Sequence, residues 1–345
     1  MNKDFLREML NTVSVSGNEE PNQKVALEFA KDFADEQIVD PVGNAISVVN
    51  PDAQVKVLLM GHIDEIGYRV THVDDKGMIH VQHTGGVSAK LYMGEPMQII
   101  HDGKKIEGVG VINHDLLKKE KVEDEDLIID IGATTKEEAA AVVSIGDSVV
   151  ADTTVHELLN DRFSSRALDD KTGAFVILEA AKKAKEMGAK IGIYANTVVG
   201  EETTGRGAFF SGTAVEPTCA ICVDVCFASD YPGMDPGRNG EITIGGGPTL
   251  CLSGITNKKM NALLADIAKE KNIPIQWEVA TSHTYTDSDT VLKTGRGVPV
   301  ALISIPLRYM HSSGELGSWK DLEWCIDLIA EALLRIDENF DFRPF

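Results

Sequence analysis

Hydrophobic and polar positions along the chain repeat with two periods, one typical of helices and one typical of strands. The helical period predicts a first helix over residues 3–11 and a second helix capped at its start by Ser16 or Asn18. Short apolar runs then predict strands over 45–49 and 55–60. The second run ends in a glycine followed by polar residues, which is typical of a central strand of an α/β sheet.

The pattern changes after about residue 67, where short alternating segments are separated by turns. Five strands are predicted in this stretch, over 68–73, 78–82, 97–101, 105–111 and 148–151. Helical spacing is scarce there, and its main occurrence covers 136–143. We therefore predict a small β-rich domain, barrel-like or PDZ-like, over residues 67–159.

After residue 160 the longer α/β pattern returns. It predicts helices over 170–187, 257–271 and 322–339 and strands over 191–199, 220–225, 274–280 and 300–305. Pro306 is expected to end the last of these strands. The predicted fold is α/β, with a mixed-sheet domain made of residues 1–66 and 160–345 that is interrupted by the β-rich domain.

Composition and charge exclude several classes of protein. The chain has 33 Lys and Arg against 54 Asp and Glu, and its net charge of −21 repels phosphate backbones, so we expect no nucleic-acid partner. The longest apolar patches are far too short to span a membrane, and the N-terminus lacks the apolar core of a signal peptide. We therefore expect a cytoplasmic protein with no membrane partner.

The cysteines do not indicate a metal cluster or a disulfide framework. Their number is odd, at five, and nothing else in the sequence suggests secretion. Cys219, Cys222 and Cys226 lie close together in the run CAICVDVCF, but this run is apolar and β-branched and predicts a buried strand. We interpret these three residues as small hydrophobic side chains of that strand.

Residues of the kinds that bind metals or transfer protons follow the predicted strands of the α/β part. In chain order they are His62 with Asp64, Asp169 with Asp170, Glu201 with Glu202, then Asp224 and His311. Because ligands bind at the carboxyl ends of strands in open α/β sheets, we expect these side chains to converge on one site. A mixed set of His and carboxylate ligands suits zinc, cobalt or manganese.

Most of these residues also have a simpler explanation. His62 taken alone could be an ordinary polar residue at a strand end. One of Asp169 and Asp170 could cap the helix that follows, which would leave the other free to bridge two cations. Glu201 and Glu202 could begin a helix. In the alternative, a cation offsets the charge of one of them and the other acts as a general base.

Asp224 carries the strongest physical argument for a bound cation, because it lies inside an otherwise apolar strand. A buried aspartate without a partner costs several kcal/mol, so Asp224 needs a cation or a hydrogen-bond donor beside it. A metal ion is one candidate for that partner, and Arg166 or Arg206 is another.

Motifs of several other enzyme classes are absent. The chain has no GxSxG, HExxH or Walker A motif, and glycines 245–247 lack the spacing of a dinucleotide fingerprint. The histidines of the β-rich stretch are interpreted as surface or structural residues, namely His72, His80, His83, His101, His114 and His156.

Six ordered segments resemble the glutamyl/tetrahedral (TET) aminopeptidases, a family of cytoplasmic metallopeptidases with two co-catalytic metals. They are GHIDEIG, RALDDKTG, GEETTGRGA, VDV, TYTDSD and IPLRYMHSSGE, and the resemblance runs from about residue 9 to residue 337. It implies a zinc-peptidase type (phosphorylase/hydrolase-like) α/β domain that carries a β-rich dimerisation domain. It also implies removal of N-terminal residues from short peptides, and dimers that build a twelve-subunit shell (a dodecamer).

The resemblance further implies a role for each matching residue. It assigns one divalent metal to His62, Asp169 and Asp224, a second metal to the bridging Asp169 with Glu202 and His311, the general-base role to Glu201, and support of His62 to Asp64. The two metals would be zinc or cobalt, or else manganese.

The chain departs from the family in the loop beside the two glutamates. Gly200 stands where the family commonly has glutamine, and Thr203, Thr204 and Gly205 replace Val-Gly-Leu. These changes concern the shape of the loop beside the scissile bond and leave the metal-facing acids intact. The stretch Tyr285-Thr286-Asp287-Ser288 also differs from the Gly-Thr-Asp-Ala that is usual in the family, which leaves the substrate preference open. A deacylase or carboxypeptidase-like amidohydrolase would use the same metal residues, and the altered loop would also fit a catalytically inactive metal-binding oligomer. A glycosidase is not favoured, because adjacent glutamates do not flank a sugar.

Overall fold

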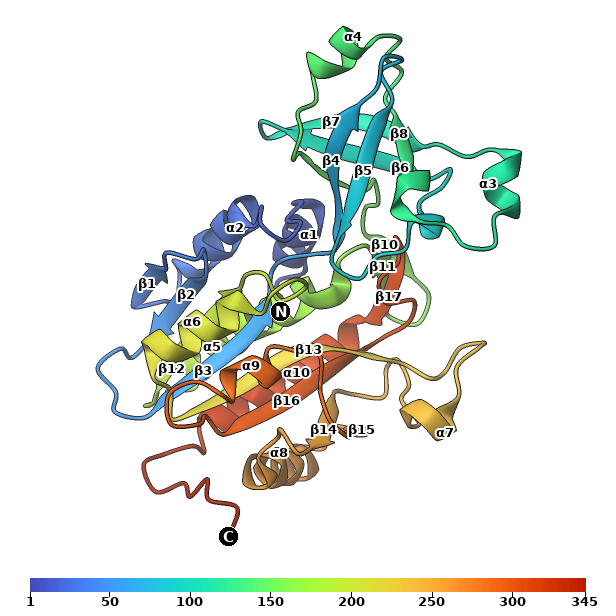
Figure 1. The fold of residues 1–345 in the computed structure, drawn as a ribbon. Helices are drawn as coiled ribbons and strands as arrows, with labels where there is room; N and C mark the ends of the chain where they lie inside the picture. The colour runs from blue at the N-terminus through green and yellow to red at the C-terminus, as the bar shows by residue number, and fades with distance from the viewer.

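The computed structural model describes residues 1–345, except for the side chains of residues 238 and 239. The larger part of the molecule is built on an eight-stranded sheet with the strand order β1-β2-β12-β3-β13-β16-β14-β15 (Figure 1). These strands are β1 (Glu36–Val39), β2 (Ala45–Val49), β3 (Lys56–His62), β12 (Gly192–Val198), β13 (Cys219–Phe227), β14 (Thr249–Ser253), β15 (Gln276–Ala280) and β16 (Val300–Leu307).

The four central strands of this sheet are parallel. β12, β3, β13 and β16 pair in parallel, whereas β2 is antiparallel to β12 and β14 is antiparallel to β16. The central strands are buried along almost their whole length, which explains why they read as continuous apolar runs. The mixed sheet of the predicted α/β fold is confirmed, and its parallel strands bring their carboxyl ends to one edge.

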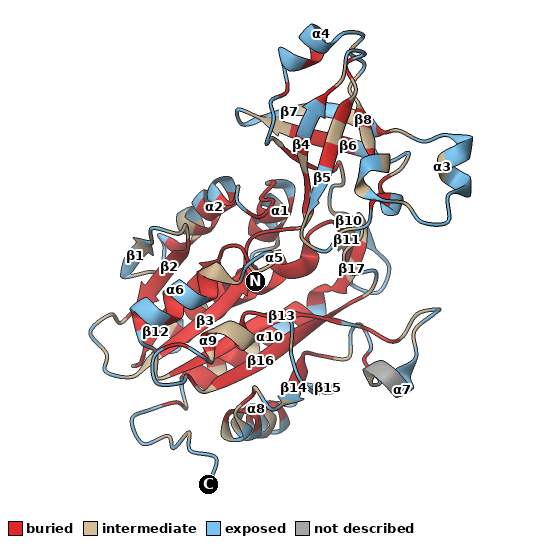
Figure 2. Ribbon diagram, viewed as in Figure 1, coloured by how far each residue is buried: buried red, intermediate tan, exposed pale blue. Residues whose placement is uncertain are grey.

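Helices cover both faces of the sheet. Alternate side chains of β3 point to opposite faces, with Val57 and Leu59 in one core and Leu58 and Met60 in the other. The first face is covered by α1 (Lys3–Asn11), α2 (Glu20–Ala30), α5 (Leu168–Glu186), α8 (Lys258–Lys271) and α10 (Trp319–Leu333). The second is covered by α6 (Arg206–Val215) and α9 (Ser288–Val291). Buried residues accordingly fill the central strands of the sheet in Figure 2, whereas the edge strand β1 is largely exposed.

A closed six-stranded barrel stands above the sheet in Figure 1. Its strands, in the order β4-β5-β8-β7-β6-β9, are β4 (Gly67–Val73), β5 (Ile79–Thr84), β8 (Ile128–Asp130), β7 (Lys104–Gly110), β6 (Pro96–His101) and β9 (Ser148–Ala151). It has a core of its own around Tyr68, Ile99 and Leu127. The outer helices α3 (His114–Lys118) and α4 (Lys136–Ala140) are largely exposed (Figure 2). The prediction of a separate β-rich body is confirmed.

A small three-stranded sheet connects the barrel segment to the α/β part. It consists of β10 (His156–Leu158), β11 (Arg162–Ser165) and β17 (Glu315–Ser318) in that order. β10 falls inside the predicted insert but pairs with β11, which lies outside it. The exact domain boundaries at 67 and 159 therefore stay a prediction. β17 brings Glu315 to the same end of the molecule as the carboxyl edge of the large sheet.

The predicted cap of the second helix is wrong. α2 begins at Glu20, and neither Ser16 nor Asn18 caps it. The Ser16 hydroxyl lies 2.9 Å from that of Thr203, and the Asn18 amide donates to the Ser148 hydroxyl over 3.3 Å. Both polar side chains are therefore used in long-range contacts that local sequence does not reveal.

The predicted end of the last strand is also wrong, because β16 continues through Pro306 to Leu307 alongside β13. The neighbouring strand β14 pairs with β16 only at Ile303 and Ser304, so the missing N–H of Pro306 removes no ladder bond on that side. Three short elements complete the fold, namely η1 (Ala89–Leu91), η2 (Asp124–Asp126) and α7 (Pro236–Asn239). Within the described residues, every helix is too short or too polar to cross a membrane.

Candidate metal centre

β3 delivers His62 to the carboxyl edge of the sheet, where the first turn of α5 lies against the strand. A Cβ on Gly61 would come within 2.5 Å of the backbone of Gly173, so the close contact between β3 and α5 requires glycine at this position. The backbone N–H of His62 donates to Asp170 over 3.1 Å, and its Nδ1 lies 3.1 Å from the carbonyl oxygen of Asp64. Because that carbonyl can only accept, Nδ1 carries the proton and Nε2 is the free acceptor nitrogen.

His311 is held in a comparable way from different elements. It lies in the loop between β16 and β17 with a φ of 62°. Its Nδ1 donates to the carbonyl oxygen of Gly86 over 2.7 Å, and its backbone N–H donates to Glu315 over 2.8 Å. Gly86 follows β5, so a segment of the barrel helps to orient this ring. As in His62, Nε2 is left as the acceptor nitrogen.

Asp169 lies between the two imidazole rings. One carboxylate oxygen is 3.2 Å from Nε2 of His62, and the other is 3.2 Å from Nε2 of His311. Two nitrogen lone pairs and one anionic carboxylate repel each other unless a cation or a proton lies between them. A carboxylate that offers one oxygen to each of two histidines has the arrangement that a bridge between two cations requires.

Glu202 completes this group of ligands. Its Oε1 is buried without a hydrogen-bond partner and lies 3.8 Å from Nε2 of His311. Buried polar atoms are rarely left unpaired, so this atom indicates a bound ion or water. Ligand atoms of His62, Asp169 and Glu202 lie within 4.8 Å of one another, and so do those of His62, Asp170 and Asp224. The side chains present therefore fit a pair of divalent cations.

Asp224 is buried at the end of β13 and has no arginine partner. Arg166 and Arg206, the two candidates that the sequence offered, each pair with a glutamate elsewhere. One Asp224 oxygen accepts the N–H of Val225 over 2.7 Å. Among the described side chains, no lysine or arginine forms an ion pair with Asp224, so a metal ion is the partner that remains from the sequence argument.

Asp170 takes the capping role that the sequence left open for one of the two adjacent acids. It accepts the N–H of Gly173 over 2.9 Å and, with its other oxygen, the N–H of His62. A Cβ on Gly173 would lie 2.3 Å from the Asp170 carboxylate, so the cap also requires that glycine. Asp170 nevertheless also lies at ligand distance from His62 and Asp224.

Asp64 was expected to support His62 through its carboxylate, but its carbonyl oxygen lies closer to the His62 ring. Its carbonyl oxygen faces the His62 ring, whereas its carboxylate oxygen is 3.6 Å from that ring's Nδ1. The carboxylate accepts the backbone N–H groups of Glu201 and Glu202 over 3.1 and 3.3 Å. Asp64 thus fixes the backbone of both glutamates and leaves their side chains free. Glu201 Oε2 lies 3.9 Å from Nε2 of His62.

Gly200 and Arg206 explain the unusual loop beside these glutamates. Gly200 has a φ of +68°, and a Cβ there would lie 1.9 Å from the Arg206 guanidinium. Arg206 in turn pairs with Glu19 at 3.0 Å. The N–H groups of Thr204 and Gly205 both donate to the Gly200 carbonyl. The loop is therefore a closed turn held from outside the site.

Burial and mutual repulsion shift the pKa values of the metal-free site. Burial raises the pKa of Glu201 to about 7 and raises that of Glu202 well above its ordinary value. The Asp169 carboxylate raises the pKa of His311 to about 9. Burial disfavours the charged form of His62, but the nearby carboxylates of Asp169 and Asp64 outweigh this effect and raise its pKa. Divalent cations would displace the protons that these shifts favour.

The cluster forms part of the wall of a cavity of about 930 Å³. Residues 278–287, the end of β13 and Met310 also line this cavity. This volume lies within the range of small-molecule sites, so the cluster opens onto a space that can hold the end of a peptide.

Two residues that hold the site were missed as functional residues in the sequence. Glu315 is buried on β17 and accepts the N–H groups of both Asp169 and His311. It stands in the segment IPLRYMHSSGE, so its motif was visible although its contacts were not. Gly86 acts through a backbone carbonyl, for which the sequence carries no signal. Neither ligand group contains a cysteine of β13, and Cys219, Cys222 and Cys226 are free and buried.

Comparisons with known proteins identify relatives along nearly the whole chain. Residues 43–328 match the family described as M42 glutamyl aminopeptidase. An aminopeptidase-named protein of Acetivibrio thermocellus is 35% identical over 96% of this chain and 98% of its own length. The lysyl aminopeptidase of Pyrococcus furiosus is 31% identical over 99% of each chain.

Solved structures show the same fold over nearly the whole chain. A TET aminopeptidase from a marine sediment archaeon, Thaumarchaeota archaeon SCGC AB-539-E09, superposes with a TM-score of 0.91 at 29% identity, covering 97% of this chain and 96% of its own. The TET1 peptidase of Pyrococcus horikoshii superposes with a TM-score of 0.85 at 28% identity, covering 96% of this chain and 98% of its own.

Proposed function

The chain belongs to the M42 glutamyl aminopeptidase family and is a peptide-bond hydrolase, and we propose that it removes N-terminal residues from short peptides at the site around Asp169. The observation that carries this assignment is the pair of Nε2 atoms, from His62 and His311, that face the two oxygens of the Asp169 carboxylate at 3.2 Å. The cavity beside them supplies space for the substrate.

We propose that two divalent cations bind here, in keeping with the metal dependence that the family implies. His62, Asp169 and Asp224 would hold one, and Asp169, Glu202 and His311 would hold the other. Bound cations would polarise the scissile carbonyl and lower the pKa of water toward neutrality. The ligand set suits zinc, cobalt or manganese, and zinc or cobalt is our proposal.

Glu201 is the proposed general base. It lines the cavity near His62. Among the described residues its side chain forms no hydrogen bond with a proposed metal ligand, so it is free to accept a proton. It takes a proton from the water as the water oxygen attacks the scissile carbonyl carbon. When the C–N bond breaks, Glu201 returns that proton to the leaving amine. Asp64 keeps Glu201 in place through its backbone N–H.

A substrate panel tests this function. The metal-supplemented enzyme is expected to release the N-terminal residue from short peptides and from aminoacyl amides. The matched control is the same peptide with its N-terminus acetylated, which is expected to stay intact. Release of acyl groups or of C-terminal residues would instead support a related deacylase or carboxypeptidase-like enzyme. Metal binding without turnover of any substrate would indicate a catalytically inactive metal-binding oligomer.

We also propose that the barrel forms dimers and that the dimers assemble into a twelve-subunit shell. The Pyrococcus horikoshii TET1 peptidase assembles into a tetrahedron or a large octahedral shell, which supports self-association of this chain. The barrel segment exposes large apolar side chains, among them Val109, Leu117 and Ile145. Light scattering tests this proposal, and a stable monomer would count against it. The cytoplasmic location stays a prediction.

A further inference from the structure

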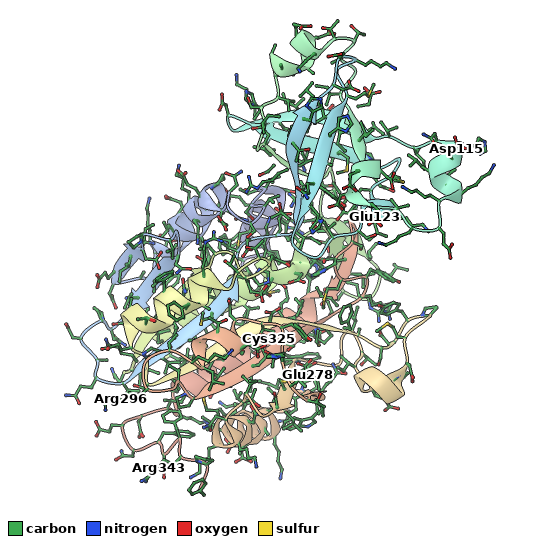
Figure 3. All side chains as sticks on the ribbon, viewed as in Figure 1. Asp115, Glu123, Glu278, Arg296, Cys325 and Arg343 are labelled. Carbon is green, nitrogen blue, oxygen red and sulfur yellow. The ribbon has the colours of Figure 1, made fainter. Side chains whose placement is uncertain are left out.

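Six carboxyl side chains line the active-site cavity, and two of them belong neither to the proposed metal ligands nor to the proposed proton-transfer group. The six are Asp169, Glu201, Glu202, Asp224, Glu278 and Asp287. Four of them form the proposed catalytic set, and Asp287 is buried close to Glu201. Glu278 comes from β15, the edge strand of the large sheet (Figure 3). The reaction proposed above gives Glu278 no role.

Glu278 is recessed among weak hydrogen-bond donors. The hydroxyl of Ser304 donates to its Oε1 over 3.3 Å, and the thiols of Cys226 and Cys251 lie against its carboxylate. Burial raises the pKa of this carboxyl group, as expected where no cation offsets its charge. Among the described side chains, no lysine, arginine or histidine forms an ion pair with Glu278, and no lysine or arginine lines the cavity. Among the described side chains, the Glu278 carboxylate therefore has no cationic partner.

Part of the lining of this cavity is apolar. Phe227, Ile242 and Met310 line it together with Glu278. A cavity that offers both apolar side chains and a carboxylate matches the chemistry of a lysine or arginine side chain, which has a hydrocarbon stem and a charged end.

The position of Glu278 along the sheet also fits such a side chain. Asp224 and Cys226 lie two residues apart on the same face of β13, which corresponds to about 7 Å along a strand. The Glu278 carboxylate contacts Cys226 and also Ser304, which lies beside Asp224 in the sheet, so it is held near the proposed ligands without belonging to either ligand group. Glu278 and the ligands line one cavity, so a substrate whose scissile bond lies at the metals could extend a four-carbon stem to Glu278.

We propose that Glu278 is the specificity-determining residue of the pocket for the substrate's N-terminal side chain, and that it selects peptides with lysine or arginine at that position. This inference rests on the proposed aminopeptidase function. Glu278 binds the side chain and not the α-amino group, since it belongs to neither ligand group at which the scissile bond is held. Its effect therefore depends on which N-terminal residue the substrate carries.

The test compares lysyl and norleucyl amides, which share the stem length and differ in the terminal charge. Wild-type enzyme is expected to show a kcat/KM for the lysyl amide at least roughly tenfold above that for the norleucyl amide. Glu278→Gln keeps the side-chain shape and is expected to remove most of this preference, because kcat/KM should fall much more for the lysyl amide than for the norleucyl amide. Glu241→Gln neutralises an exposed glutamate next to Ile242 and serves as the matched control, with the lysyl preference kept.

Each alternative outcome has a defined meaning. An equal loss with both amides in Glu278→Gln, or a wild type that does not prefer the lysyl amide, overturns the inference and leaves the aminopeptidase function in place. If neither amide is hydrolysed, the proposed function fails, and calorimetric binding of lysinamide against norleucinamide decides the inference by itself. Tighter binding of lysinamide that is lost in Glu278→Gln supports it, and equal binding of the two ligands overturns it. Thermal unfolding of each variant verifies that it is folded.

Discussion

The imidazole Nδ1 of His311 donates a hydrogen bond of 2.7 Å to the carbonyl oxygen of Gly86, which joins a proposed metal ligand to the segment that follows a barrel strand. The barrel segment therefore contributes to the site itself, apart from any role in assembly. It supplies the carbonyl that fixes both the tautomer and the orientation of this histidine, and groups in that position tune the affinity of a metal site.

Gly86→Ala is predicted to weaken metal binding. A Cβ at this position would lie 3.1 Å from the His311 ring, so the ring or the loop must move. We expect a loss of roughly 10- to 100-fold in affinity for one of the two cations, measured by competition with a chelator at fixed pH. Gly254→Ala is the control, because a Cβ there meets nothing within 4 Å. Unchanged affinity in Gly86→Ala would show that the carbonyl does not position His311.

Glu201→Gln is predicted to abolish most turnover without loss of metal. The variant keeps the backbone N–H that Asp64 accepts, so the loop should retain its shape. We expect kcat to fall by roughly 10²- to 10⁴-fold, as for loss of a general base, with little change in KM. Elemental analysis must show the wild-type metal content. Persistent turnover with the metals bound would remove Glu201 as the base.

Glu65→Gln is predicted to destabilise the fold. Glu65 is buried against the guanidinium of Arg166 and lies 2.7 Å from Nζ of Lys171. Removing its charge leaves two buried cations without their counter-ion, so we expect the free energy of unfolding to fall by roughly 3–5 kcal/mol. Chemical denaturation measures the change. Glu20→Gln, which alters an exposed pair with Lys24, should leave stability nearly unchanged. Equal effects of the two substitutions would contradict this account of Glu65.

Asp321 is predicted to make stability depend on pH. It accepts the N–H groups of Gly245 and Gly247 over 2.7 and 2.8 Å, and burial raises the pKa of its carboxyl group to about 6. An unfolded aspartate has a pKa of about 3.9, so the folded state binds the proton more tightly. The stabilisation is complete at a pH below the pKa of the unfolded state. It is lost as the pH rises through the pKa of the folded state.

Asp321→Asn tests this dependence, because asparagine does not titrate. Between about pH 5 and about pH 7.5, wild type should lose about 1 kcal/mol of unfolding free energy relative to the variant. Urea denaturation with a chelator present at both pH values removes the contribution of bound metal. A difference between wild type and variant that does not change with pH would show that the pKa of Asp321 is not raised.

The sequence predicted the α/β sheet and the barrel because both depend on local periodicity. Continuous apolar runs such as β13 identify buried parallel strands, and the switch to short alternating segments after Gly67 identifies the barrel. Elements whose burial depends on distant partners were missed. The strand β14, which lies between β16 and β15, and the helix α6 (Arg206–Val215) are examples, since their sequences alone do not show which face is covered.

The candidate site could be predicted only as far as side chains near strand ends reveal it. Asp224 was identified because an aspartate in an apolar strand requires a partner, and the structure supplies no arginine for it among the described residues. The contacts of Glu315 and the carbonyl of Gly86 depend on loops that meet only in the folded chain. The Ser16 cap was wrong for the same reason, because Thr203 takes its hydroxyl.

The central claim is that Asp169 bridges two cations, and the metal content of Asp169→Ala tests it most directly. Wild-type protein, loaded with zinc or cobalt and freed of excess metal, is predicted to hold two ions per chain by elemental analysis. Asp169→Ala is predicted to retain at most one and to lose hydrolysis of short peptides, whereas Asp32→Ala, at an exposed aspartate, should match wild type. Two ions retained by folded Asp169→Ala would contradict the bridge.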